Sequence, residues 1–254
     1  MIDMHSHILF NVDDGPKSFN EAIEMLEVAS KEGITEIIST SHTQHPSYNV
    51  LASKVTEQVA QLQDELNKQQ IPLTIHLGHE VRLCEQIIEL VREKQILTLA
   101  DSQFLLLELP SSHIPNYTKN IIQELLKEDI TPIIAHPERN KAIAEKPERL
   151  ERLIREGAAA QLTAGSIAGH FGRGVQKTSM ELVKANLVHT YGSDAHNLST
   201  RPFLFEKGLS YLEKHKQIES VDFFLENNGR ILEKKPLLMY EPDLQIKKKW
   251  WSFA

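Results

Sequence analysis

The segment Met1-Ile2-Asp3-Met4-His5-Ser6-His7 decides the fold of this 254-residue chain. Its apolar beginning predicts a buried strand, and its two histidines follow where that strand ends. Because side chains alternate along an extended chain, the two imidazoles of an HxH sequence lie on one face. Near the other end of the sequence, Ser193-Asp194-Ala195-His196 repeats this spacing with a carboxylate and an imidazole. The two pairs predict a metal site that the fold closes around, since zinc, manganese and iron accept both ligand types.

The same rhythm of apolar strand, functional residue and helix recurs along the chain. Strands are predicted over 1–4, 34–40, 73–77, 104–109, 130–135, 158–162 and 187–191. Strands that alternate with helices imply a parallel sheet, and seven such units with a common functional end imply an α/β barrel. An open doubly wound sheet is the alternative, but it normally gathers ligands at one switch point rather than from nearly every strand.

Two helices are predicted with defined limits. Ser18-Phe19-Asn20-Glu21 has the form of a capping box, and the helix that it begins is expected to end at Gly33. A second helix is predicted over 51–69, where Val55, Val59, Leu62 and Leu66 form one apolar stripe.

Composition excludes several classes of protein. The formal charge of −7 argues against nucleic acid as a partner. No secretory segment follows Met1, and no apolar run is long enough to cross a bilayer, so we expect a cytoplasmic protein. The single cysteine, Cys84, excludes an internal disulfide and fits a reducing compartment. A cysteine nucleophile in a phosphate-binding loop needs an arginine six positions further on, where this chain has Leu90, so Cys84 is interpreted as a packing residue.

Metal-ligating side chains stand at the ends of nearly all predicted strands. An ionised carboxylate such as Glu108 in an apolar strand is costly unless it is paired or bound to metal. Asp13 and Asp14, on the first loop, are both candidates. The occurrence of metal-ligating residues at nearly every predicted strand end predicts a multinuclear metal site. Its candidate ligands are His5, His7, Asp14, His42, Glu80, Glu108, His136, Asp194 and His196. The other histidines are assigned to no metal, although His45 lies close enough to His42 to touch a substrate.

Two arginines follow these ligands closely. Arg139 lies in the loop directly after His136, and Arg201 lies five residues beyond His196. A planar guanidinium binds phosphate oxygens in a forked geometry, so arginines beside a metal cluster indicate a phosphorylated substrate. For Arg201, a surface salt bridge is the alternative.

These residues resemble the signature of the polymerase-and-histidinol-phosphatase (PHP) superfamily. One branch is closer still, the manganese-dependent bacterial protein-tyrosine phosphatases of the CpsB/CapC/YwqE type. The blocks that carry this resemblance are 1–8, Val12-Asp13-Asp14-Gly15-Pro16, Ile134-Ala135-His136-Pro137-Glu138-Arg139-Asn140 and Gly192-Ser193-Asp194-Ala195-His196-Asn197. The resemblance covers nearly the whole chain and implies a distorted (β/α)7 barrel.

The resemblance also implies three divalent ions, with Mn²⁺ expected and iron or zinc as alternatives. His5, His7, Glu80 and Asp194 would hold the first ion; Glu80, Glu108 and His136 the second; Asp14, His42 and His196 the third. A water shared between such ions loses a proton near neutral pH and supplies the nucleophile. Arg139 and Arg201 would then offset charge on the phosphoryl oxygens, and His42 could assist the leaving group.

The implied activity is hydrolysis of phosphotyrosine on the C-terminal tail of a membrane-associated bacterial tyrosine kinase that controls capsular or exopolysaccharide synthesis. A small-molecule phosphoesterase acting on a compound such as histidinol phosphate is the main alternative, and a non-catalytic metal-binding module is another.

A barrel domain is expected over 1–235, with a C-terminal extension over 236–254. The basic and aromatic run Lys247-Lys248-Lys249-Trp250-Trp251 is typical of either a weak contact with an anionic membrane surface or an exposed, flexible end.

Overall fold

The computed structural model describes residues 1–244. The basic and aromatic run at 247–251 lies outside the described residues, so its contact with a membrane stays a prediction, as does the domain boundary at 235. In the described part of the chain, no helix combines the length and apolarity needed to span a membrane.

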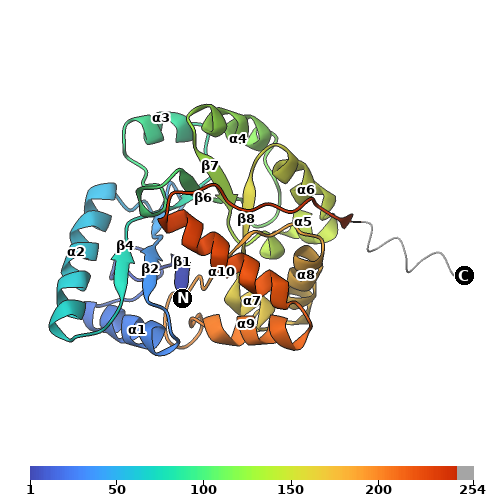
Figure 1. The fold of residues 1–254 in the computed structure, drawn as a ribbon. Coiled ribbons are helices and arrows are strands. Elements are labelled where there is room, and N and C mark those ends of the chain that lie inside the picture. Colours follow the sequence, from blue (N-terminus) through green and yellow to red (C-terminus); the bar gives the residue numbers. More distant parts are fainter. Residues whose placement is uncertain (245–254) are drawn as a thin grey trace, which may run out of the picture.

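Strands and helices alternate along the chain (Figure 1). The strands are β1 Ile2–Ser6, β2 Glu36–Ser39, β3 His42–Thr43, β4 Thr74–His76, β5 Glu80–Arg82, β6 Phe104–Glu108, β7 Thr131–Ile134, β8 Ala159–Thr163 and β9 Thr190–Gly192. The helices are α1 Phe19–Lys31, α2 Ala52–Lys68, α3 Ile87–Arg92, α4 Thr118–Lys127, α5 Lys141–Glu145, α6 Glu148–Arg155, α7 Ala164–Ile167, α8 Arg173–Lys184, α9 Phe205–Lys214 and α10 Ile218–Leu232. Short 3₁₀ helices span η1 Leu99–Asp101 and η2 Pro137–Arg139.

All strand pairs are parallel, in the orders β1-β2-β4 and β3-β5-β6-β7-β8-β9. A parallel bridge between Ser6 and Ala195 joins the segment after β9 to β1. The backbone N–H of His7 also donates to the carbonyl of Ala195 at 2.8 Å. The sheet therefore curls until its first and last strands meet, which confirms the predicted distorted (β/α)7 barrel and excludes the open sheet.

Two of the seven predicted strands are each followed, after a break, by a second short strand that was not predicted. The strand predicted over 34–40 is β2, and β3 follows it; the strand predicted over 73–77 is β4, and β5 follows it. At the break, the N–H of Thr40 donates to Ser6 O at 2.8 Å, and the N–H of Glu80 donates to Thr40 O at 3.1 Å. These links replace regular ladder bonds and leave two short strands, which begin at His42 and Glu80.

The inside of the barrel is a small apolar core closed at one end by α10. Met4, Ile38, Leu106 and Ile133 are among its fully buried side chains, and Ile231 reaches them from α10. Figure 1 shows α10 lying across the sheet, with the other helices around it. The amide of Asn228 on α10 donates to the carbonyls of Ile2 and Tyr191, at 2.9 and 2.6 Å, and so ties the helix to β1 and β9. This end of the barrel is sealed, so the site must lie at the other end.

The two helices with predicted limits are present and pack as expected. The apolar stripe of α2 is buried along its length. Ser18 caps α1 by accepting a hydrogen bond from the N–H of Glu21, and Gly33 follows with a φ of +85°. The carboxylate of Glu21 accepts from the N–H of Lys17 rather than Ser18, so the capping box is displaced by one residue. One large cluster of buried side chains between the helices and the sheet forms the outer core.

Replacing Gly192 with alanine is expected to destabilise the barrel where β9 meets β1. A Cβ at this position would lie 2.7 Å from the Cβ of His5, closer than carbon atoms approach without movement. We expect Gly192→Ala to lower the free energy of unfolding by about 1–3 kcal/mol, as overpacking does in other cores. The matched control is Gly174→Ala on α8, where an added Cβ meets nothing within 4 Å. Equal stability of the two variants in urea unfolding would contradict the close approach.

His189 predicts a loss of stability in acid. Its ring is buried, its Nδ1 accepts a hydrogen bond from the N–H of Ala160 at 3.1 Å, and burial lowers its pKa to about 4. An unfolded histidine titrates near 6.5, so the unfolded chain binds the extra proton between these two values. The contribution of the neutral ring is complete above pH 6.5 and falls by up to about 3 kcal/mol as the pH decreases toward 4.

The variant His189→Gln keeps an acceptor for Ala160 but does not titrate. Urea unfolding without added metal should therefore show a shallower decline of stability for the variant across this pH range. Parallel declines in the two proteins would show that His189 is not responsible.

Candidate metal centre

The structure brings all nine candidate ligands to the carboxyl ends of the strands. They come from the end of β1 and the loop after it, from β3, β5 and β6, and from the loops after β7 and β9: His5, His7, Asp14, His42, Glu80, Glu108, His136, Asp194 and His196. The parallel sheet explains this convergence, because the carboxyl ends of all its strands lie at the same end of the barrel.

Glu80 lies at the centre of the cluster. Its carboxylate is buried, with His136 Nε2 at 2.8 Å, His42 Nδ1 at 3.0 Å and His7 Nε2 at 3.3 Å. Burial alone would raise the pKa of Glu80, but His5, His42 and His136 together hold it well below its ordinary value. Glu80 is thus ionised and has both oxygens directed at imidazole nitrogens, as a carboxylate that bridges two cations would.

Asp194 joins the histidines to the arginines. Its Oδ1 lies 3.3 Å from His5 Nε2 and 3.5 Å from His7 Nε2. Its Oδ2 accepts hydrogen bonds from Arg139 and, at 2.9 Å, from Arg201. Burial opposes ionisation, but the two guanidinium groups and the nearby histidines hold the pKa of Asp194 well below its ordinary value. Both predicted arginines therefore bind Asp194, which is itself a candidate ligand.

Hydrogen bonds from one ring nitrogen orient three of the histidines. Nδ1 of His5 lies 2.9 Å from Gln161 Oε1, and Nδ1 of His7 lies 3.1 Å from Asp13 Oδ2. Nδ1 of His196 lies 2.9 Å from the carbonyl of Asp194. Since these partners are acceptors, Nδ1 of each ring donates the hydrogen bond and Nε2 is directed at the cluster. A second residue orients metal-ligating histidines in the same way.

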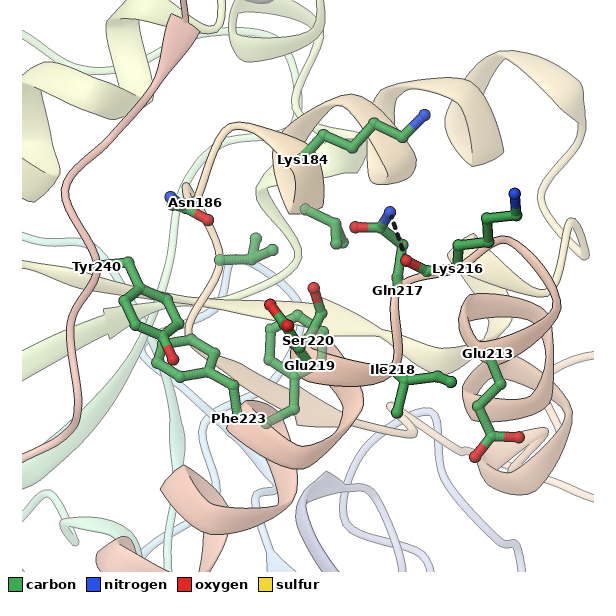
Figure 2. Close-up of a pocket in the computed structure, with 13 residues that line it drawn as sticks. Lys184, Asn186, Glu213, Lys216, Gln217, Ile218, Glu219, Ser220, Phe223 and Tyr240 are labelled. Carbon is green, nitrogen blue, oxygen red and sulfur yellow. Dashed lines mark hydrogen bonds between the residues drawn. The ribbon is translucent and has the colours of Figure 1, made fainter.

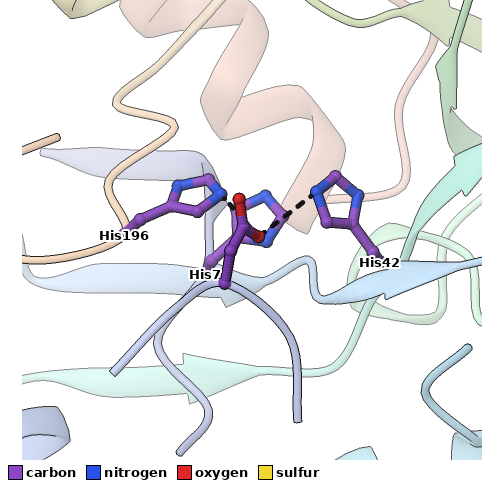
Figure 3. Close-up of side chains that lie close together, drawn as sticks. His7, His42 and His196 are labelled. Carbon is purple, nitrogen blue, oxygen red and sulfur yellow. Dashed lines mark ion pairs between the residues drawn. The ribbon is translucent and has the colours of Figure 1, made fainter. Parts of the chain in front are cut away.

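The two adjacent aspartates have different surroundings. Asp13 is buried and accepts from His7, from the N–H of His42 at 3.1 Å and from the N–H of Gly15 at 3.0 Å. Asp14 instead places Oδ1 at 3.2 Å from His196 Nε2 and 3.5 Å from His42 Nε2. Figure 3 shows the imidazoles of His7, His42 and His196 gathered around these ion pairs. The geometry therefore favours Asp14 as the candidate ligand and gives Asp13 the task of orienting His7.

The fit of this donor set to metal ions can be tested on its buried polar atoms. Six of them meet the geometry of a hydrogen bond with no residue in the described range, although most of them face one another or a further ligand at ion-pair distances: Asp14 Oδ1, His42 Nδ1, Glu80 Oε2, Glu108 Oε2, Asp194 Oδ1 and His196 Nε2. Buried polar atoms are normally satisfied, and a carboxylate or imidazole that lacks a donor is what a cation would satisfy. Within residues 1–244, ligand atoms converge in three overlapping groups that contain His7, Asp14, His42 and His196, then His5, His7 and Glu80, then His42, Glu80 and Glu108. The residues fit more than one ion.

Sequence reasoning missed the partners of the ligands. Arg82 on β5 pairs in register with Glu108, and its Nη1 lies 3.0 Å from Glu108 Oε1. Burial and the charge of Glu80 raise the pKa of Glu108, while Arg82 counteracts them. Gln161 is the polar residue of an otherwise apolar predicted strand, and this could have indicated its contact with a ligand such as His5. Arg82 stands two residues after Glu80, the spacing of one strand face, and this was a second signal.

Some neighbours of the ligands are directed elsewhere. His79 precedes Glu80, but its Nδ1 accepts from the N–H of Leu97 at 3.1 Å, and burial lowers its pKa to about 4. His76 pairs with Glu36 at 2.6 Å. Cys84 packs against the outer core, and burial raises the pKa of its thiol, which makes it a poor nucleophile.

A cavity of about 310 Å³ opens onto the cluster. Its lining combines five candidate ligands with Arg139 and Arg201, and adds the rings of His45 and Tyr48. A larger cavity of about 540 Å³ lies between α8, α9 and α10, where Figure 2 shows Lys184, Glu213 and Tyr240 around it. None of the candidate ligands lines that larger cavity.

Fold and site together define a class: a (β/α)7 barrel with a histidine–carboxylate centre and two arginines at the carboxyl ends of its strands. A family model described as "Capsular polysaccharide synthesis, CpsB/CapC" matches residues 1–233. The chain belongs to the CpsB/CapC family, which confirms the predicted resemblance.

Relatives of known sequence and structure agree with this assignment. The putative tyrosine-protein phosphatase CapC of Staphylococcus aureus is 38% identical over 251 residues, covering 99% of this chain and 98% of its own. The tyrosine-protein phosphatase YwqE of Bacillus subtilis is 37% identical over 249 residues, or 98% of each chain. A chain from crystal structures of YwqE from Bacillus subtilis and CpsB from Streptococcus pneumoniae, described as metal-dependent tyrosine phosphatases, superposes with a TM-score of 0.93. It is 38% identical, and the match covers 96% of this chain and 98% of that one.

Substitution of the two aspartates should separate their tasks. Asp13→Ala removes the acceptor of three buried hydrogen bonds and should destabilise the metal-free protein by about 1–3 kcal/mol. Asp14→Ala should change the metal-free protein less but weaken Mn²⁺ binding, because a candidate ligand oxygen is lost. Thermal melts with chelator and calorimetric Mn²⁺ titrations measure both effects. The reverse order, with Asp13→Ala the more stable metal-free variant, would contradict these roles.

Proposed function

We propose that this chain is a metal-dependent protein-tyrosine phosphatase. The observation that carries the proposal is the set of contacts of Asp194, whose carboxylate faces two histidines through Oδ1 and two arginines through Oδ2. These contacts hold the guanidinium groups beside the candidate metal ligands, where one phosphoryl group can contact the arginines and the metal ions together. The names of relatives that share almost the full length of the chain give independent support.

We further propose three bound ions, with Mn²⁺ as the preferred metal. His5, His7, Glu80 and Asp194 would hold the first, and Glu80, Glu108 and His136 the second. Asp14, His42 and His196 would hold the third. The central place of Glu80 supports its role as a bridge, and the contacts of Asp14 with His42 and His196 support the third group. When bound, such ions activate water at neutral pH and neutralise charge on the phosphoryl oxygens.

The arginines and histidines of the chain supply the remaining chemistry. Arg139 and Arg201 are partly exposed at the cavity, so their guanidinium groups can bind equatorial phosphoryl oxygens as charge develops there. Gln161, Asp13 and the carbonyl of Asp194 hold the protons on Nδ1 of their histidines, which fixes the ligand atoms before substrate arrives. The stack of Arg139 on Phe171, at 5.3 Å, restrains that guanidinium further.

The leaving group of phosphotyrosine suits this site. A phenol has a pKa near 10, so the phenolate leaves more readily than the alkoxide of serine or threonine. Both ring nitrogens of His42 lie against carboxylates, Nδ1 against Glu80 and Nε2 against Asp14. A ring nitrogen of His42 that binds metal cannot also donate a proton to the leaving group, so its two predicted roles compete. Because the phenolate leaves readily, the reaction needs no strong acid at this position.

We propose that the substrate is phosphotyrosine on the flexible tail of a bacterial tyrosine kinase that controls capsular or exopolysaccharide synthesis. The description of the family, which names capsular polysaccharide synthesis, supports this context. The accessible arginines at the open end of the barrel support a substrate that enters as an extended, exposed segment.

Chelation followed by refilling tests the proposed function. Protein stripped with EDTA should lose hydrolysis of a phosphotyrosine peptide and regain it with Mn²⁺, because the ligand carboxylates alone cannot activate water. His136→Ala should lower kcat/KM for the peptide by about 100-fold or more even with Mn²⁺, as loss of a positioned electrostatic group does. Histidinol phosphate and p-nitrophenyl phosphate are assayed in parallel. Full activity after chelation would contradict the metal mechanism, and a preference for histidinol phosphate would contradict the protein substrate.

A further inference from the structure

The loop between β3 and α2 presents a rigid turn beside the metal centre. His45 and Tyr48 exchange backbone hydrogen bonds, from His45 N–H at 3.0 Å and from Tyr48 N–H at 3.2 Å. Within the same loop, Asn49 Oδ1 accepts from the hydroxyl of Thr43 at 2.9 Å and from the N–H of Gln44 at 3.1 Å. The backbone that carries the two rings is therefore fixed by hydrogen bonds within the turn.

The rings of this turn are almost parallel to the candidate ligand His42. The planes of Tyr48 and His42 differ by 7°, with centroids 5.8 Å apart, and those of His45 and His42 differ by 22°, with centroids 4.8 Å apart. The planes of His45 and Tyr48 differ by 17°. Both rings are half-buried and line the cavity that opens onto the cluster. They form a group of nearly parallel aromatic rings next to the position where we place the phosphoryl group.

We infer that His45 and Tyr48 form an aryl-binding wall that receives the phenyl ring of a phosphotyrosine side chain. This inference rests on the proposed function and names the part of the site that selects an aryl ester over an alkyl ester. The wall contacts the substrate ring and takes no part in bond breaking.

The chemistry of the ester explains the selection. In phosphotyrosine a single oxygen joins phosphorus to the ring, so a phosphoryl group held by Arg139 and Arg201 places the ring at the wall of the same cavity. Leu109 and Pro137 also line this cavity and add apolar surface. Stacked aromatic pairs gain free energy beyond their buried area. A phosphoserine side chain has only a methylene group at this place and cannot stack.

Replacing Tyr48 tests the wall in the manganese-loaded protein. Tyr48→Leu keeps the bulk but removes the flat ring, and Tyr48→Phe keeps the ring. The ligands are benzylphosphonate and ethylphosphonate as inhibitors that cannot be hydrolysed, and a phosphotyrosine peptide as substrate. Tyr48→Leu should weaken inhibition by benzylphosphonate about fivefold to tenfold and raise KM for the peptide by a similar factor. Inhibition by ethylphosphonate should not change.

Two further variants complete the comparison. Tyr48→Phe should retain the ratio of the two phosphonate inhibition constants that Tyr48→Leu changes, because the ring and not the hydroxyl makes the contact. Tyr240→Leu removes an exposed tyrosine at the larger cavity, away from the candidate ligands, and should leave both inhibition constants unchanged.

The ratio of the two inhibition constants decides the outcome. If Tyr48→Leu leaves this ratio unchanged, whether or not both phosphonates bind more weakly, the inference that Tyr48 contacts the aryl ring is wrong. If the unmodified protein does not hydrolyse the phosphotyrosine peptide, the proposed function fails. The phosphonate ratio still tests the wall in that case, because it measures binding without turnover.

Discussion

Two buried carboxylates, Glu80 and Asp194, set the constraint on which the rest of the structure depends. A buried ionised carboxylate is costly unless cations or donors surround it. Here the barrel surrounds Glu80 with imidazoles from several strands and surrounds Asp194 with two histidines and two arginines. A parallel sheet makes this arrangement available, because residues far apart in sequence meet wherever their strands end.

Closure of the barrel and assembly of the centre are the same event. The N–H of His7 donates to Ala195 O, and the N–H of Asp194 donates to His5 O, each at 2.8 Å. The backbone of the first motif thus pairs directly with the backbone of the last. Gly192 permits this approach, since any larger residue would collide with His5. Fold and function are coupled at this seam, while α10 seals the opposite end of the barrel.

The sequence was sufficient for the features that follow from periodicity and strand ends. Seven strand positions, the limits of α1 and α2, and the convergence of the nine candidate ligands could all be predicted in this way. The breaks at Thr40 and Gly78, and the short strands that follow them, could not, because long-range hydrogen bonds to Ser6 O and from Glu80 decide them. Arg82, Gln161 and Tyr48 were missed for a related reason. Each acts through a neighbour from another strand or turn, and that neighbour is known only once the register is known.

A crystal of the protein grown with Mn²⁺ and measured at the manganese absorption edge tests the central claim most directly. Three anomalous peaks are predicted, with the carboxylate of Glu80 between two of them and Asp14, His42 and His196 around the third. Arg139 and Arg201 should then face the side of the cluster that is open to the cavity. A single peak, or peaks that do not contact Glu80, would contradict the account of a three-ion centre built around this carboxylate.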